Sequence, residues 1–115
     1  MDELFEKSLL YDFYGELLTE HQQAVYQSFV FEDMSLAEVA QEQGITRQGV
    51  HDLVKRCDRI LQGYEERLHL VEKFVSIKKT VTRIEKLTEP NDGKDTLENR
   101  LSEIRALTHD ILEEL

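Results

Sequence analysis

The stretch SLAEVAQEQGITRQGVHDLVKRC, residues 35–57, decides how the rest of the chain is interpreted. Ser35 followed by Glu38 is the capping-box pattern that begins a helix, and Gly44 suits the left-handed residue that often ends one. Thr46 can then cap a second helix. Two short helices around a tight glycine turn predict a helix-turn-helix motif, whose second helix can enter the DNA major groove.

The small and apolar residues of this stretch predict how the two helices pack. We expect the second helix to cross close to Ala40, and Ile45 to fill the space between the helices. Gln43 departs from the motif, because that position is commonly apolar. The spacing alone also fits two capped helices of an ordinary helical protein, or a motif that serves as a protein-binding surface. The predicted motif core is Val39, Ala40, Gly44, Ile45, Val50 and Leu53.

This packing leaves hydrogen-bond donors and cations on the outer face of the second helix. Such side chains suit base edges and phosphates. We expect the first three of the candidate residues to lie near bases and the last three near phosphates. The candidate DNA-binding residues are Arg47, Gln48, His51, Lys55, Arg56 and Arg59.

The remaining sequence predicts further helices and no strand. Apolar residues follow helical spacing over 4–18, and Thr19 with Gln22 forms a second capping box. Between Arg47 and Thr88 the only interruptions are two glycines, and we expect a break or bend near Gly63. Residues 88–95, TEPNDGKD, predict a loop. We therefore expect an all-α fold, with a helix-turn-helix bundle over 1–62 and a C-terminal helical hairpin over 63–115.

The last predicted helix repeats apolar residues at heptad spacing, with one polar member. The helix before it carries a drifting apolar stripe that is typical of globular packing. Two helices cannot bury stripes this wide by themselves, so we expect a second subunit to cover them in a homodimer. The heptad positions are Leu97, Leu101, Ile104, Thr108, Ile111 and Leu115. The surface expected to be covered includes Leu68, Val71, Val75, Ile84, Leu101, Ile104 and Ile111.

The formal net charge of −10 is unevenly distributed. Residues 1–43 hold ten acids and one base, and residues 89–115 hold eight acids and three bases. Residues 44–88 hold ten bases and six acids, a net of +4. Any contact with a polyanion should therefore use the middle of the chain. Because residues 44–63 carry a net of only +2, DNA binding should be weak and very salt-sensitive.

The sequence offers little for other classes of protein. The four histidines and the single cysteine, Cys57, lack metal-ligand spacing, so we expect no metal and no cofactor. No phosphate loop, nucleophile elbow or paired-carboxylate motif is present, which argues against an enzyme. No apolar run is long enough for a membrane span, and the acidic N-terminus does not resemble a signal peptide. We expect a cytoplasmic protein.

The residues from YDFYGELLTEHQQAVYQ through SLAEVAQEQGITRQGVHDLVKR resemble region 4 of bacterial sigma-70-type factors. The chain length and the continuation ILQGYEERLHLVEKF resemble, more narrowly, the YlxM family. That resemblance implies a sigma region 4-like helix-turn-helix bundle. It also implies a DNA-binding protein whose genes neighbour that of the signal recognition particle GTPase, and hence a role in protein targeting.

Two functions are consistent with these observations. The protein can be a helix-turn-helix DNA-binding protein, a regulator linked to the signal recognition particle pathway. Alternatively, it can be an accessory protein or RNA-binding factor of the particle, with no specific DNA target. In the second case the motif would dock on the particle's protein or RNA.

Overall fold

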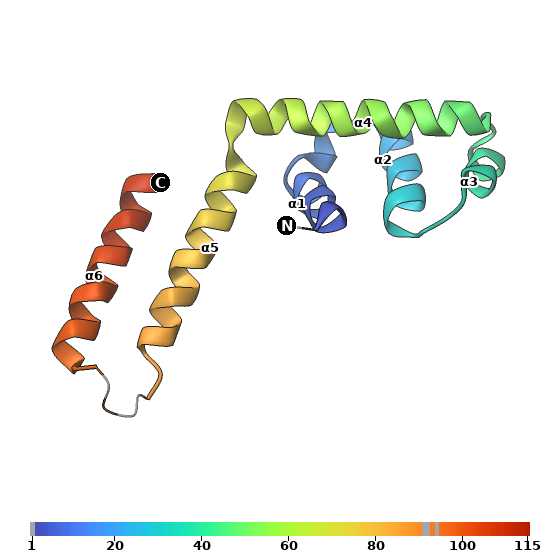
Figure 1. Cartoon of the computed structure of the whole chain (residues 1–115). Helices are drawn as coiled ribbons and strands as arrows, with labels where there is room; N and C mark the ends of the chain where they lie inside the picture. Colours follow the sequence, from blue (N-terminus) through green and yellow to red (C-terminus); the bar gives the residue numbers. More distant parts are fainter. Residues whose placement is uncertain (1, 91–92, 94) are drawn as a thin grey trace. The chain divides into compact units, whose positions relative to one another are not determined.

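The computed structural model describes residues 2–90, 93 and 95–115, and these form two compact units, Met1–Val71 and Glu72–Leu115. No strand occurs among these residues, and the all-α prediction is confirmed. Helices α1, α2, α3 and α4 are labelled in Figure 1. The bounds are α1 Glu3–Tyr14, η1 Gly15–Leu17, α2 Glu20–Tyr26, η2 Gln27–Phe31, α3 Leu36–Gln43, α4 Arg47–Leu68, α5 Leu70–Leu87 and α6 Leu97–Glu114.

The first unit is built on α4, against which α1, α2 and α3 each pack. From Val50 to Leu61 the buried residues of α4 recur every three or four positions, so one side of this part of the helix faces the core. Aromatic contacts extend this core: Tyr11 stacks on Tyr26 with ring centroids 5.6 Å apart. The buried cluster comprises Leu10, Tyr14, Leu18, Val25, Tyr26, Val39, Ala40, Val50, Val54, Cys57 and Leu61.

The helix starts predicted from sequence are confirmed. Thr19 accepts a hydrogen bond from the Gln22 N–H while the Gln22 side chain accepts one from the Thr19 N–H, which completes a capping box. Ser35 and Glu38 form the second box in the same way. Both boxes satisfy N–H groups that a helix start would otherwise leave unpaired.

The expected break near Gly63 is wrong, because α4 continues through Gly63 to Leu68. Leu61 is fully buried and Tyr64 packs against the core, so the helix is held on both sides of the glycine. The chain breaks instead at His69, which adopts a left-handed conformation with φ 55°. The expected division at 62/63 accordingly differs from the observed one, which falls after Val71.

Polar contacts from α1 and α4 stabilise the break at His69. The Tyr14 hydroxyl donates to Glu65 Oε1 at 2.6 Å and accepts a hydrogen bond from the Leu70 N–H at 3.2 Å. The Val71 N–H donates to the same Glu65 oxygen at 3.0 Å. The first N–H groups of α5 thus find partners that no preceding helical turn could supply.

The second unit pairs α5 with α6 as a hairpin, side by side in Figure 1. Ser76 Oγ donates to Glu114 Oε2 at 2.9 Å, and Arg83 contacts Glu103 at 3.0 Å. Of the loop expected at 88–95, residues 91, 92 and 94 lie outside the described residues. No helix in the described part of the chain combines the length and apolar character needed to cross a membrane.

Candidate nucleic-acid interface

Helices α3 and α4 meet through the turn at residues 44–46. Gly44 has φ 68° and its N–H donates to the Ala40 carbonyl, as a left-handed helix end requires. A Cβ at Gly44 would meet nothing within 4 Å, so the glycine is needed for its backbone conformation alone. The turn places the start of α4 directly after the end of α3.

Side-chain caps define the first turn of α4. Thr46 Oγ1 accepts a hydrogen bond from the Gly49 N–H at 2.9 Å. A Cβ on Gly49 would lie 3.1 Å from that oxygen, closer than most such contacts. Gly49, an unusual residue for a recognition helix, therefore leaves room for the cap that starts the helix.

The residues predicted to form the motif core lie on α3, on α4 and in the turn between them. Val39 and Val50 are fully buried and Ala40 is nearly so. Ile45 and Leu53 are partly buried and pack against the same cluster. The inner faces of α3 and α4 are thereby joined to α1 and α2, which fixes the outward face of α4.

The six candidate DNA-binding residues are all exposed on α4. At about 100° per residue, Gln48, Lys55 and Arg59 lie opposite the buried stripe of Val50, Val54, Cys57 and Leu61. Arg47 and Arg56 lie on the two flanks of the helix, on opposite sides of it. Across residues 2–90, 93 and 95–115, no acidic side chain forms a salt bridge with Arg47, Lys55, Arg56 or Arg59. Four cations therefore remain available to a polyanion.

One acid lies within this face. Asp52 Oδ1 accepts a hydrogen bond from Gln48 Nε2 at 2.9 Å and lies 3.6 Å from His51 Nδ1. Both neighbours are candidates for base contact, so Asp52 competes with DNA for their donors. The Gln–Asp spacing of four residues on a helix is the sequence signal that could have identified this contact.

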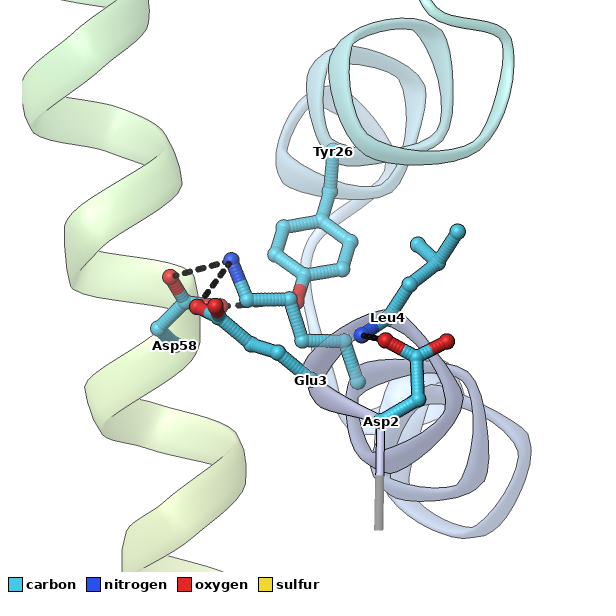
Figure 2. A network of polar contacts seen from close by, with 6 residues as sticks. Asp2, Glu3, Leu4, Tyr26 and Asp58 are labelled. Carbon is cyan, nitrogen blue, oxygen red and sulfur yellow. Dashed lines mark hydrogen bonds and ion pairs between the residues drawn. The ribbon is translucent and has the colours of Figure 1, made fainter.

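The other acid of the segment, Asp58, is used inside the protein. Figure 2 shows its carboxylate where α4 meets α1 and α2. The Tyr26 hydroxyl donates to Asp58 Oδ1 at 2.7 Å, and Lys7 Nζ lies 3.7 Å from Oδ2. Lys7 also lies 3.9 Å from Glu3 Oε1. Burial, followed by the hydrogen bond to Asp58, raises the pKa of Tyr26, so its hydroxyl stays a donor.

These contacts change the charge that a ligand meets at α4. Residues 44–63 contain four bases and two acids, but Asp58 is partly buried and paired with Lys7. The outer face then presents four bases against Asp52, a net of +3. The surface is more positive than the charge of the segment suggests.

A cavity of about 390 Å³ adjoins this face, between the start of α2 and the outer side of α4. The cavity brings His21 and Gln22 beside Arg56. The sequence analysis did not predict that His21 or Gln22 belongs to the site. Only their place near the N-cap of α2 could have suggested it. The lining residues are Thr19, His21, Gln22, Gly49, Asp52, Leu53 and Arg56.

Cys57 belongs to the core rather than to a reactive site. Its side chain is fully buried, and burial together with the negative charge of Asp58 raises the pKa of the thiol to about 11. Within the described ranges of the chain, no three His, Cys, Asp or Glu side chains gather in a way that could hold a metal ion. The exposed residues of α4 offer hydrogen-bond donors and positive charge.

Comparison with known sequences identifies relatives along nearly the whole chain. The profile of the UPF0122 family, described as "Putative helix-turn-helix protein, YlxM / p13 like", matches residues 1–104. The UPF0122 protein of Desulforamulus reducens is 38% identical over 113 residues, which cover 98% of this chain and 96% of the relative. The one from Clostridium botulinum is 41% identical over 96 residues, 83% of this chain and 88% of the relative. A Listeria monocytogenes relative is 40% identical over 104 residues, 83% and 94% respectively.

Proposed function

Because the chain belongs to the UPF0122 family of YlxM/p13-like helix-turn-helix proteins, we propose that it binds duplex DNA through the outer face of α4. Arg47, Gln48 and His51 would lie near base edges. Lys55, Arg56 and Arg59 would contact phosphates. This assignment follows the usual docking of a recognition helix, in which the helix start approaches the bases.

The observation that carries the proposal is the separation of the two sides of α4. The buried side is fixed by a cluster that includes all three other helices of the first unit. The outer side is exposed and presents four cations whose side chains pair with no acid in the described residues. Phosphate contacts from such cations would fix the position and orientation of the helix on a duplex.

The number of cations predicts the strength of binding. Each phosphate neutralised adds about 0.9 to the slope of log affinity against log salt. Four cations in one subunit therefore support weak binding that falls steeply with salt. A homodimer is part of this proposal, because two recognition helices would double the contacts and suit half-sites about one DNA turn apart.

We propose further that the protein acts in the signal recognition particle pathway, as a cytoplasmic regulator without catalytic activity. This step rests on the resemblance to the YlxM family. The alternative is an accessory factor that binds the particle's protein or RNA. Asp52 favours the alternative, because a carboxylate bound to Gln48 and close to His51 weakens direct base recognition.

Binding of three ligands would distinguish these functions. The full-length protein is titrated at low salt with random duplex DNA, with the particle's RNA and with its GTPase. Arg47→Ala combined with Arg56→Ala should lose most duplex binding. A control with the same charge change, Lys79→Ala combined with Lys86→Ala, alters two exposed residues of α5 and should bind as the parent does.

A different pattern would reject DNA as the ligand. That pattern is no duplex binding by the parent at low salt, together with normal binding of the GTPase or the RNA by the Arg47→Ala, Arg56→Ala variant. A pull-down from native lysate with and without nuclease gives an independent result. A partner retained after nuclease treatment is a protein.

A further inference from the structure

The hairpin of α5 and α6 buries little of its apolar surface. Leu87 is the one buried residue of α5, and α6, Leu97–Glu114, has none. Six large apolar side chains of the second unit, Glu72–Leu115, are between 40% and 79% exposed. They are Phe74 and Val81 on α5, and Leu97, Leu101, Leu112 and Leu115 on α6.

These exposed residues form a second stripe on each helix, separate from the contact between the helices. On α6 the half-buried residues include Ile104, Leu107 and Ile111. At about 100° per residue, the exposed leucines of α6 lie roughly a quarter-turn around the helix axis from these half-buried residues. On α5, Phe74 and Val81 have the same offset from the side that includes Thr80 and Leu87.

The direction of the helices places both stripes on one side of the hairpin. Contacts from Ser76 to Glu114 and from Arg83 to Glu103 show that α5 and α6 run antiparallel. When two antiparallel helices each carry a stripe that is rotated in the same sense away from their shared contact, both stripes face the same side of the pair. The hairpin therefore presents exposed apolar side chains of both helices on one side, with Arg105 and Thr108 between those of α6.

The charges beside this face indicate what covers it. Lys78 and Glu85 flank the stripe of α5, and Glu98 and Arg105 flank that of α6. Lys78 Nζ also lies 5.9 Å from the centre of the Phe74 ring. A border with both signs of charge does not suit nucleic acid or an anionic lipid surface, which require positive charge throughout. It does suit a copy of itself, since a twofold axis can bring opposite charges together.

We propose that the apolar face of the hairpin is covered by the same face of a second copy, which gives an antiparallel four-helix bundle. In this bundle α5 of one copy lies over α6 of the other, and all neighbouring helices are antiparallel. The register set by Ser76–Glu114 and Arg83–Glu103 then places Glu85 of one copy nearly level with Arg105 of the other. This surface deepens the homodimer of the proposed function but does not require DNA binding.

The surface differs from the one that sequence alone suggested. Leu101 is common to both. Ile84, Ile104 and Ile111 are half-buried within the chain, so they offer less apolar surface to a second copy. Five exposed residues, Phe74, Val81, Leu97, Leu112 and Leu115, take their place.

Sedimentation equilibrium of the full-length protein, without nucleic acid, tests the proposal. The parent should sediment at micromolar concentration with twice the chain mass of 13.5 kDa. Leu101→Glu should sediment as a single chain. Leu17→Glu is the matched control, because Leu17 and Leu101 are equally exposed at 57% but Leu17 lies in the first unit. This control should keep the parent mass.

Two outcomes would overturn the proposal: a parent that sediments as a single chain, or a Leu101→Glu variant that remains a dimer. A parent of single-chain mass would leave the face to a different protein. Far-UV circular dichroism confirms that each variant is folded. Arg105→Glu should weaken the dimer, and adding Glu85→Arg should restore part of the loss. Equal dimer affinity for Arg105→Glu and the parent would contradict the placement of α5 over α6.

Discussion

The two units of this chain are both helical, but they differ in what stabilises their helices. In the first, eleven buried residues from four helices and the adjoining segments form one cluster. In the second, two helices of 18 residues each leave six large apolar side chains exposed between Glu72 and Leu115. Helical periodicity was clear in both regions. Periodicity predicts a helix, but whether the apolar stripe is covered depends on how many helices the unit contains.

The largest effect should come from removing a buried leucine of the first unit. Leu61 is fully buried, so Leu61→Ala should lower the free energy of unfolding by about 2–5 kcal/mol at every protein concentration. Leu112→Ala on α6 should have an effect that depends on concentration, since Leu112 is 67% exposed in a single chain. Urea unfolding followed by circular dichroism at two protein concentrations measures both. Similar losses in the two variants would erase the distinction between the units.

Overpacking the motif should have the next largest effect. Ala40 lies where α3 meets α4, so Ala40→Leu should cost about 1–3 kcal/mol. Ala106→Leu makes the same change on the exposed surface of α6 and should be nearly neutral. Gly44→Val should also destabilise, by roughly 1–3 kcal/mol, because a β-branched residue resists a φ of 68°. If Ala40→Leu and Gly44→Val both melt like the parent, the packing of the motif is not as described.

The Tyr14 hydroxyl makes two of the hydrogen bonds that hold the break at His69. Tyr14→Phe would leave the Leu70 N–H without its partner and remove a hydrogen bond to Glu65, at a cost of about 1–3 kcal/mol. Tyr64 stacks on Tyr14 with ring centroids 5.9 Å apart, and its hydroxyl makes no hydrogen bond within the described residues, so Tyr64→Phe serves as the control. Amide hydrogen exchange at residues 68–71 should increase in Tyr14→Phe alone. Unchanged exchange there would mean that other contacts hold the break at His69.

A smaller effect is expected from the acid on the outer face of α4. Asp52→Asn removes one negative charge beside the proposed phosphate contacts, which is worth about 1 kcal/mol, or roughly fivefold in DNA affinity, at low salt. The unfolding free energy should hardly change, because Asp52 is exposed. Glu66→Gln changes the charge of another exposed residue of α4, further from the motif, and is the control. Weaker DNA binding by Asp52→Asn would show that the Asp52 carboxylate holds Gln48 in the orientation that contacts a base.

Sequence reasoning was accurate where local chemistry decides the structure. Both capping boxes and the left-handed Gly44 depend on residues within a few positions, and each was predicted correctly. The break at His69 was missed because it depends on Tyr14, which lies more than fifty positions earlier in the chain. A glycine is the usual signal for such a break, but at Gly63 the buried Leu61 and the packed Tyr64 outweigh it.

The candidate interface shows the same limit. The exposure of all six residues follows from helical geometry once the buried side of α4 is known. The partners of the two acids do not follow from spacing alone. Asp58 is held by Tyr26 and Lys7 from α2 and α1, and these contacts become visible only after the helices are packed together.

The most direct test of the account is the salt dependence of duplex binding. The affinity of the full-length protein for random duplex DNA is measured over a range of salt concentrations below the physiological one. In the Arg47→Ala, Arg56→Ala variant the slope should fall by about one unit per subunit, because the phosphate contact of Arg56 is lost. The affinity should fall further at every salt concentration, because Arg47 no longer reaches a base edge. The Lys79→Ala, Lys86→Ala control should keep the parent slope. An equal fall in both variants would mean that net charge alone drives binding. A parent slope unchanged by loss of Arg47 and Arg56 would contradict the assignment of α4 as the DNA-binding helix.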